Sequence, residues 1–222
     1  MRAVEPGGEV FASVVVGISF LIGRGVHSGP GTPVSEVVGM RALLLVLVLG
    51  VFAAATAAAT VTPETQTTLK TLAALNGTAF DVAFMRVLVP VSEEAVEIAM
   101  AATLNADHTQ VLKWNQAVVE RKNAEVRQML GWLKTMGASP TKRNAGVQTA
   151  PVKKMRVLKD AALEKAYLPL MATHLEQSAA LAQLAAKKAS NPAVRSFATS
   201  VAKKEMSDAT MLRSWLKGWY GK

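Results

Sequence analysis

Charged residues recur at matching positions in the two halves of the chain, where they could form a buried ionic layer. Along two predicted helices, positions taken at alternating steps of three and four are apolar except for two central positions in each helix. A third predicted helix has a polar centre on its own inward face. The layer would comprise Lys122, Glu125, His174, Ser178, Glu205 and Asp208. Buried charges are costly unless they are paired or bind a metal. The alternative is a stripe rotated by one position, which would turn these side chains to solvent.

The patterns of common enzymes are missing from the sequence. A di-iron bundle needs Glu-x-x-His on two helices, and this pattern does not occur. The chain has no Gly-x-Ser-x-Gly elbow, no glycine-rich phosphate loop and no cysteine. We therefore expect a protein that is not an enzyme.

The second half of the chain repeats the first at a constant offset of 83 residues. Trp132-Leu133-Lys134 aligns with Trp215-Leu216-Lys217, and Phe84 aligns with Tyr167. A repeat of this length, filled by two helical patterns, indicates a duplicated helical hairpin. The sequence therefore predicts an all-α, four-helix bundle built from two duplicated hairpins.

Cap residues and proline positions set the expected helix limits. Asp107 is the expected N-cap of the second long helix, Gly137 follows its end, and Asn191 precedes a proline at the start of the last. Pro90 and Pro169 should each kink a helix or begin a new one. The expected helices span 64–75, 78–104, 108–136, 152–189 and 191–217, with hairpins at about 78–137 and 152–220 and a linker at 138–151.

The first 59 residues are expected to lie outside the folded domain. Residues 40–59 have a basic start, an apolar core and small residues before Thr60, which is typical of a secretory signal cleaved near Ala59. An uncleaved membrane anchor is the alternative. Residues 1–39 are interpreted as a mis-called start or an extension. The domain at 60–222 would be periplasmic or extracellular, and without cysteine it cannot be a lipoprotein.

The formal net charge is +9, and basic residues gather around the linker between the hairpins. They are Lys142, Arg143, Lys153, Lys154, Arg156 and Lys159. Aromatic residues do not alternate with them, as they would in a protein that binds single-stranded nucleic acid. We expect no nucleic-acid partner, a solvated linker or one that touches an anionic envelope surface, and a monomer or weak dimer.

These positions resemble the domain-of-unknown-function 305 family, exported prokaryotic proteins with a ferritin-like bundle. Its motif is an aromatic residue, a methionine four later and paired histidines, with Gln, Glu, Met and Trp in the next helix. The first copy here has Phe84, Leu88 and Val91, whereas the second has Tyr167, Met171 and His174. The resemblance implies a ferritin-like fold.

Some members of the family are implicated in copper binding, and the resemblance leaves three ligands for it: Met129, Met171 and His174. Two thioethers and one imidazole suit copper(I) better than zinc. The alternative roles are core packing for the methionines and a hydrogen bond from His174 to Glu205 or Asp208. We expect a non-catalytic envelope module without a cofactor, and a low-capacity copper(I)-binding protein is the alternative.

Overall fold

The computed structural model describes residues 61–141 and 149–221, and every regular element within them is an α-helix. The all-α expectation is therefore confirmed for these residues. The expected start, signal and cleavage site at 1–60 lie outside them, as do Lys142 and Arg143. The described residues belong to one compact unit, Ala54–Lys222.

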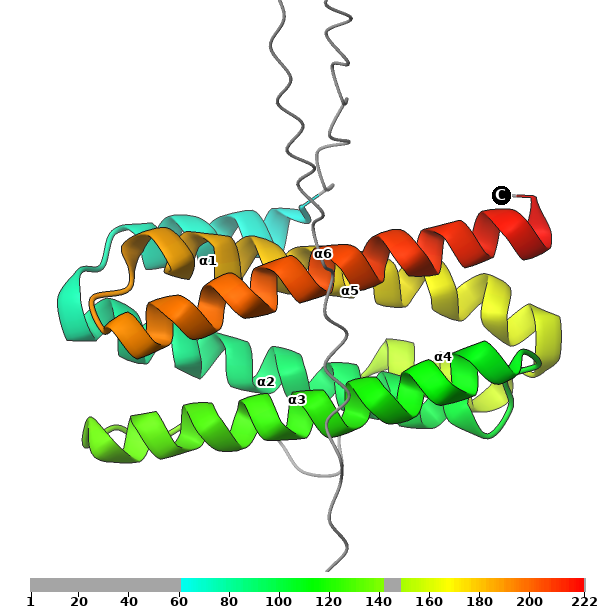
Figure 1. The fold of residues 1–222 in the computed structure, drawn as a ribbon, viewed down its shortest axis with the longest axis horizontal. Helices are drawn as coiled ribbons and strands as arrows, with labels where there is room; N and C mark the ends of the chain where they lie inside the picture. Colours follow the sequence, from blue (N-terminus) through cyan, green and yellow to red (C-terminus); the bar gives the residue numbers. More distant parts are fainter. Residues whose placement is uncertain (1–60, 142–148, 222) are drawn as a thin grey trace, which may run out of the picture. The chain divides into compact units, whose positions relative to one another are not determined.

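Six helices are present in the described residues, four long and two short (Figure 1). The long helices have 27 to 29 residues, and the short ones have 11 and 8. They are α1 (Pro63–Ala73), α2 (Gly77–Thr103), α3 (Thr109–Thr135), α4 (Ala150–Val157), α5 (Asp160–Lys188) and α6 (Pro192–Tyr220).

The ends of the helices follow local chemistry, with one correction. The Asn191 side chain accepts a hydrogen bond from the Ala193 backbone amide at 2.8 Å, as an N-cap should. Gly137 has a φ of +67°, a conformation that costs other residues free energy. Asp107 is not a cap: α3 is preceded by His108, which makes no side-chain cap bond.

The helix expected over 152–189 is in fact two helices, α4 and α5. Leu158 and Lys159 are extended, and Asp160 has a φ of +50°. The Asp160 backbone amide donates instead to the Asn105 carbonyl at 2.8 Å, which ties the break to the α2–α3 loop. Pro90 and Pro169 begin no new helix, because α2 and α5 continue through them.

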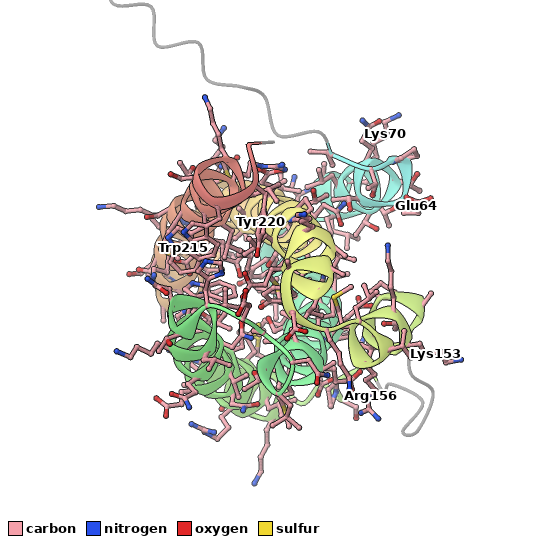
Figure 2. The ribbon with its side chains drawn as sticks, turned by 90° about the vertical axis from the view of Figure 1, so that its right-hand side faces the viewer. Glu64, Lys70, Lys153, Arg156, Trp215 and Tyr220 are labelled. Carbon is pink, nitrogen blue, oxygen red and sulfur yellow. The ribbon has the colours of Figure 1, made fainter. Side chains whose placement is uncertain are left out.

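The long helices pack in a definite order. α2 packs against α3, α5 packs against α6, and α2 also lies against α5. The short helices α1 and α4 both cover the α2–α5 side (Figure 2). None of the helices in 61–141 and 149–221 has the length and apolar character needed to cross a membrane.

Candidate functional site

A polar layer divides the core of the long helices into two large apolar clusters, beside a small third one of Ala182, Val201 and Ala202. The first cluster contains Ile98, Trp114 and Tyr167, and the second contains Phe84 and Leu133. Between the clusters, each long helix contributes one polar side chain that is at most 1 % exposed. These residues are Ser92 in α2, Lys122 in α3, Ser178 in α5 and Glu205 in α6.

Lys122 is the central cation of this layer. Its Nζ donates to Glu205 Oε1 across the α3–α6 seam and lies 3.0 Å from Glu125 Oε2 on its own helix. Burial lowers the pKa of Lys122 below its usual 10.5, and the Glu125 carboxylate opposes this shift. The ammonium is therefore acceptable inside the core only because two carboxylates face it.

A second set of ion pairs closes the layer toward solvent. Arg121 Nη2 donates to Asp208 Oδ2 at 2.7 Å, and Lys204 Nζ donates to Asp208 Oδ1 at 2.5 Å. Arg121 Nε also lies 3.6 Å from Glu125 Oε1. Each cation of the layer is thus matched by a carboxylate of the same chain.

The α3–α6 seam is bridged by these side chains and not by close backbone packing in the described part of the chain. A groove of about 360 Å³ runs along it. Phe197 and Val201 line its apolar part, and Arg121, Glu125 and Lys204 line its polar part. The groove therefore leads from solvent to the edge of the ionic layer.

His174 is half-buried and lies away from this groove. Its Nε2 donates to the Val91 carbonyl at 3.0 Å, since a carbonyl oxygen can only accept. The imidazole lines a separate cavity of about 540 Å³ between α2, α4 and α5, together with Glu94 and Lys154. The alternative role predicted for His174, a hydrogen bond to Glu205 or Asp208, is not the one that Nε2 has.

The expected ligand set of Met129, Met171 and His174 is not brought together. Both methionines are fully buried, Met171 in the first apolar cluster and Met129 in the second. α3 and α5 run in the same direction (Figure 1). Met129 follows the layer residue Lys122 by seven positions, whereas Met171 precedes the layer residue Ser178 by seven. At 1.5 Å per residue, the two methionines are separated by on the order of 20 Å along the helices. One ion cannot bind ligands so far apart. Met171 and His174 are one turn apart on α5, but Met171 packs in the first apolar cluster and His174 Nε2 is bonded to the Val91 carbonyl.

The described residues also lack a group of three or more His, Asp or Glu side chains that could hold a metal. Lysine and arginine face the carboxylates of the layer, although Glu205 Oε2 has no hydrogen-bond partner in the described part of the chain. A carboxylate oxygen surrounded by cations does not fit a metal bound at the layer. Met171 and His174 alone supply too few donors for a complete copper(I) site.

Two buried carboxylates that the sequence analysis did not identify hold the helix connections. Asp81, at 1 % exposure, accepts bonds from the Ser190 and Asn191 backbone amides, both at 2.9 Å. Glu164, fully buried, accepts bonds from the Asp107 and His108 amides at 2.8 and 2.7 Å. The signal was present in the sequence, because acidic residues stand at both positions, 83 apart.

Glu164 also binds the aromatic end of α6. Its Oε2 lies 2.6 Å from His108 Nδ1 and accepts a bond from the Tyr220 hydroxyl at 2.8 Å. The His108 ring stacks on Trp219 with 3.8 Å between centroids. Burial would raise the pKa of Glu164, but the bonds from the His108 backbone, Tyr220 and the His108 ring outweigh it and lower the pKa below 4.5.

The fold of this unit is found in solved structures. CopM in the Cu(I)-bound form matches with a TM-score of 0.57 and 15% identity, over 64% of this chain and 98% of that chain. A candidate secreted DUF305 protein from Streptomyces coelicolor matches with a TM-score of 0.57 and 18% identity, over 62% and 93%. CopM in the apo form has a TM-score of 0.52 and 17% identity, over 64% and 98%. At these identities the likeness concerns the fold. No curated protein matches the chain.

The family is identified from the sequence itself. The profile described as "Domain of unknown function (DUF305)" matches residues 52–133 and 164–222, which is more than half of the chain and includes parts of both hairpins. The segment between the matches contains the linker and α4, where the expected helix is broken. The chain belongs to the DUF305 family.

Proposed function

We propose that the protein is an exported, non-catalytic helical module that acts in the cell envelope through structure or interaction. The observation that carries the proposal is the closed ionic layer. Lys122, Arg121 and Lys204 are engaged by Glu205, Glu125 and Asp208. Each of these cations faces at least one carboxylate, so the charges compensate one another, although Glu205 Oε2 accepts no hydrogen bond within the described residues. Charges that balance one another inside a core favour a structural role over a catalytic one.

We also infer that the four long helices are two copies of one hairpin, arranged as a ferritin-like four-helix bundle. Contacts between matching positions support this inference. Lys122 binds Glu205, and Val91 binds His174, each across 83 residues. Asp81 and Glu164, also 83 apart, make the same backbone contacts on the opposite hairpin.

Export is supported by the apolar segment at 40–59 and by the likeness to a candidate secreted protein. Fractionation of the native host should place the protein in the envelope or the medium, and intact-mass analysis should give a chain that begins near Thr60. A cytoplasmic product that retains residues 1–39 would overturn this part of the proposal.

Copper(I) binding is the second candidate, favoured by the fold likeness to CopM in its Cu(I)-bound form. In this chain it would rest on Met171 and His174, which are one helical turn apart. Purified protein should be titrated against a copper(I) chelator beside His174→Ala, with His108→Ala as a control at the other histidine. Sub-micromolar affinity that only His174→Ala abolishes would replace the non-catalytic, metal-free proposal. Equal, weak binding in all three proteins is the result we expect.

A further inference from the structure

The two hairpins meet each other through positions that are equivalent in the two copies. Lys122 and Glu205 stand 83 residues apart, as do Val91 and His174, and each residue binds its own equivalent. In a two-fold assembly, a residue on the axis meets its own copy. The α2–α3 and α5–α6 hairpins therefore present each other with a self-complementary face, a statement that rests on the duplication proposed above.

A self-complementary face does not by itself choose its partner. The α2–α3 hairpin could pair with α5–α6 of its own chain, or with α2–α3 of a second copy. Most buried charges would accept either pairing, because they keep their sign between copies. Arg121 corresponds to Lys204, and Glu125 corresponds to Asp208. The Arg121–Asp208 ion pair would thus be replaced by an equivalent pair in a like-with-like assembly.

Lys122 and Glu205 are the exception among the buried charged positions in the described residues, because their sign reverses between the copies. Their side chains are 1 % and 0 % exposed. Pairing α2–α3 with a second α2–α3 would bring two buried ammonium groups together. Pairing α5–α6 with its like would bring two buried carboxylates together. In the first arrangement each Lys122 would keep Glu125 of its own helix but lose the carboxylate that Glu205 supplies across the seam, and in the second each Glu205 would lose its cation.

We propose that Lys122 and Glu205 form a recognition site between hairpins. The residue at this position, 122 in one hairpin and 205 in the other, carries what is called here the axial charge. The site selects a partner hairpin whose axial charge is opposite and excludes one whose axial charge is the same. The partner in the normal fold is the other hairpin of the same chain. The same face would accept an oppositely charged hairpin from a second copy, which is hairpin exchange. Polar groups placed singly in an apolar seam select partners in this way in coiled coils.

The test uses two variants, each with a single charge reversal at one of the two positions. Lys122→Glu and Glu205→Lys are made in separate mature chains. The two hairpins of the first variant then both carry a negative axial charge, and those of the second both carry a positive one. The two chains are unfolded, mixed in equal amounts and refolded together. The expected product is a dimer that contains one chain of each variant, detected by native mass spectrometry, with a higher melting temperature than either variant refolded alone.

Two controls accompany the mixture. The double variant Lys122→Glu/Glu205→Lys restores unlike charges within one chain and should refold as a monomer with nearly the wild-type melting temperature. Glu120 and Lys203 also reverse sign across 83 residues but are exposed. A mixture of Glu120→Lys and Lys203→Glu chains should therefore contain monomers only.

A third variant keeps the proposal testable if the single reversals fail to fold alone. Lys122→Met/Glu205→Met removes the axial charges but keeps similar volume, so it should fold without discrimination and give a dimer fraction on concentrated refolding where wild type gives none. A mixture without mixed dimers, or an apolar variant as strictly monomeric as wild type, would overturn the recognition site. If the double charge reversal still folds normally in that case, the internal repeat and the non-catalytic role stand.

Discussion

Asp81 and Glu164 make the same contact at opposite ends of the long helices. Each carboxylate belongs to the first helix of one hairpin and accepts bonds from two backbone amides in the connection of the other hairpin. Asp81 thus fixes the α5–α6 connection, and Glu164 fixes the α2–α3 connection. The reciprocal arrangement joins the two hairpins at both ends, independently of the ionic layer between them.

Removing either carboxylate charge should destabilise the fold. Hydrogen bonds to charged groups contribute about 1.5–3 kcal/mol, so Glu164→Gln and Asp81→Asn should each lower the free energy of unfolding by about that amount. Urea denaturation near neutral pH measures it. Glu120→Gln, at an exposed position of α3, is the control and should have almost no effect. Equal stability of Glu164→Gln and wild type would mean that the amides are satisfied by water.

Glu164 should also make stability depend on acid pH. Its pKa in the folded protein lies below 4.5, so between the two pKa values the unfolded chain binds more protons. The stabilisation that Glu164 contributes is therefore complete above its pKa in the unfolded chain. It is lost as the pH falls through its pKa in the folded protein. The stability difference between wild type and Glu164→Gln should shrink over the pH range below about 4.5. A difference that stays constant over this range would contradict the assignment.

Lys122→Met should be strongly destabilising, because it leaves the buried Glu205 carboxylate without its cation. Breaking a buried pair in this way costs about 3–5 kcal/mol. Lys203→Met, on the exposed face of α6, is the matched control, and its effect should stay within about 0.5 kcal/mol. Chemical denaturation of both variants decides the point. A loss as small as that of the control would show that Glu205 is neutral in the folded protein.

Two glycines of the α3 region should respond to alanine in opposite directions. Gly131 lies inside α3, with no atom within 4 Å of an added Cβ, so Gly131→Ala should stabilise by about 0.5–1 kcal/mol. Gly137 has a left-handed backbone, so Gly137→Ala should destabilise by about 1–2 kcal/mol. Thermal unfolding of the two variants provides the comparison. Effects of the same sign would be inconsistent with the helix end at Thr135.

The sequence predicted elements that depend on short-range chemistry. The end of α3 before Gly137 and the start of α6 after Asn191 follow from local backbone preference, and the structure has both. The all-α class follows from the helical periodicity of the apolar residues. The inward stripe also placed Lys122 and Glu205 on the core side of their helices, where the structure has them at the border of two apolar clusters.

Features that depend on contacts between distant parts of the chain could not be predicted from local sequence chemistry. The break at Leu158 and Lys159 carries no glycine or proline, and it is stabilised by the bond from Asp160 to Asn105, a residue of another connection. The distance between Met129 and Met171 depends on how far along its helix each residue lies. A ligand list drawn from residue types therefore combined side chains that the fold keeps apart.

The division of the core by a polar layer has a consequence for cooperativity. The layer cuts across the helices and not along the chain, so each long helix contributes residues to both apolar clusters. Neither cluster can melt without disrupting helices that also support the other. The two halves of the core should therefore unfold in one transition, and the slowest amide exchange should fall on both sides of Lys122 in α3.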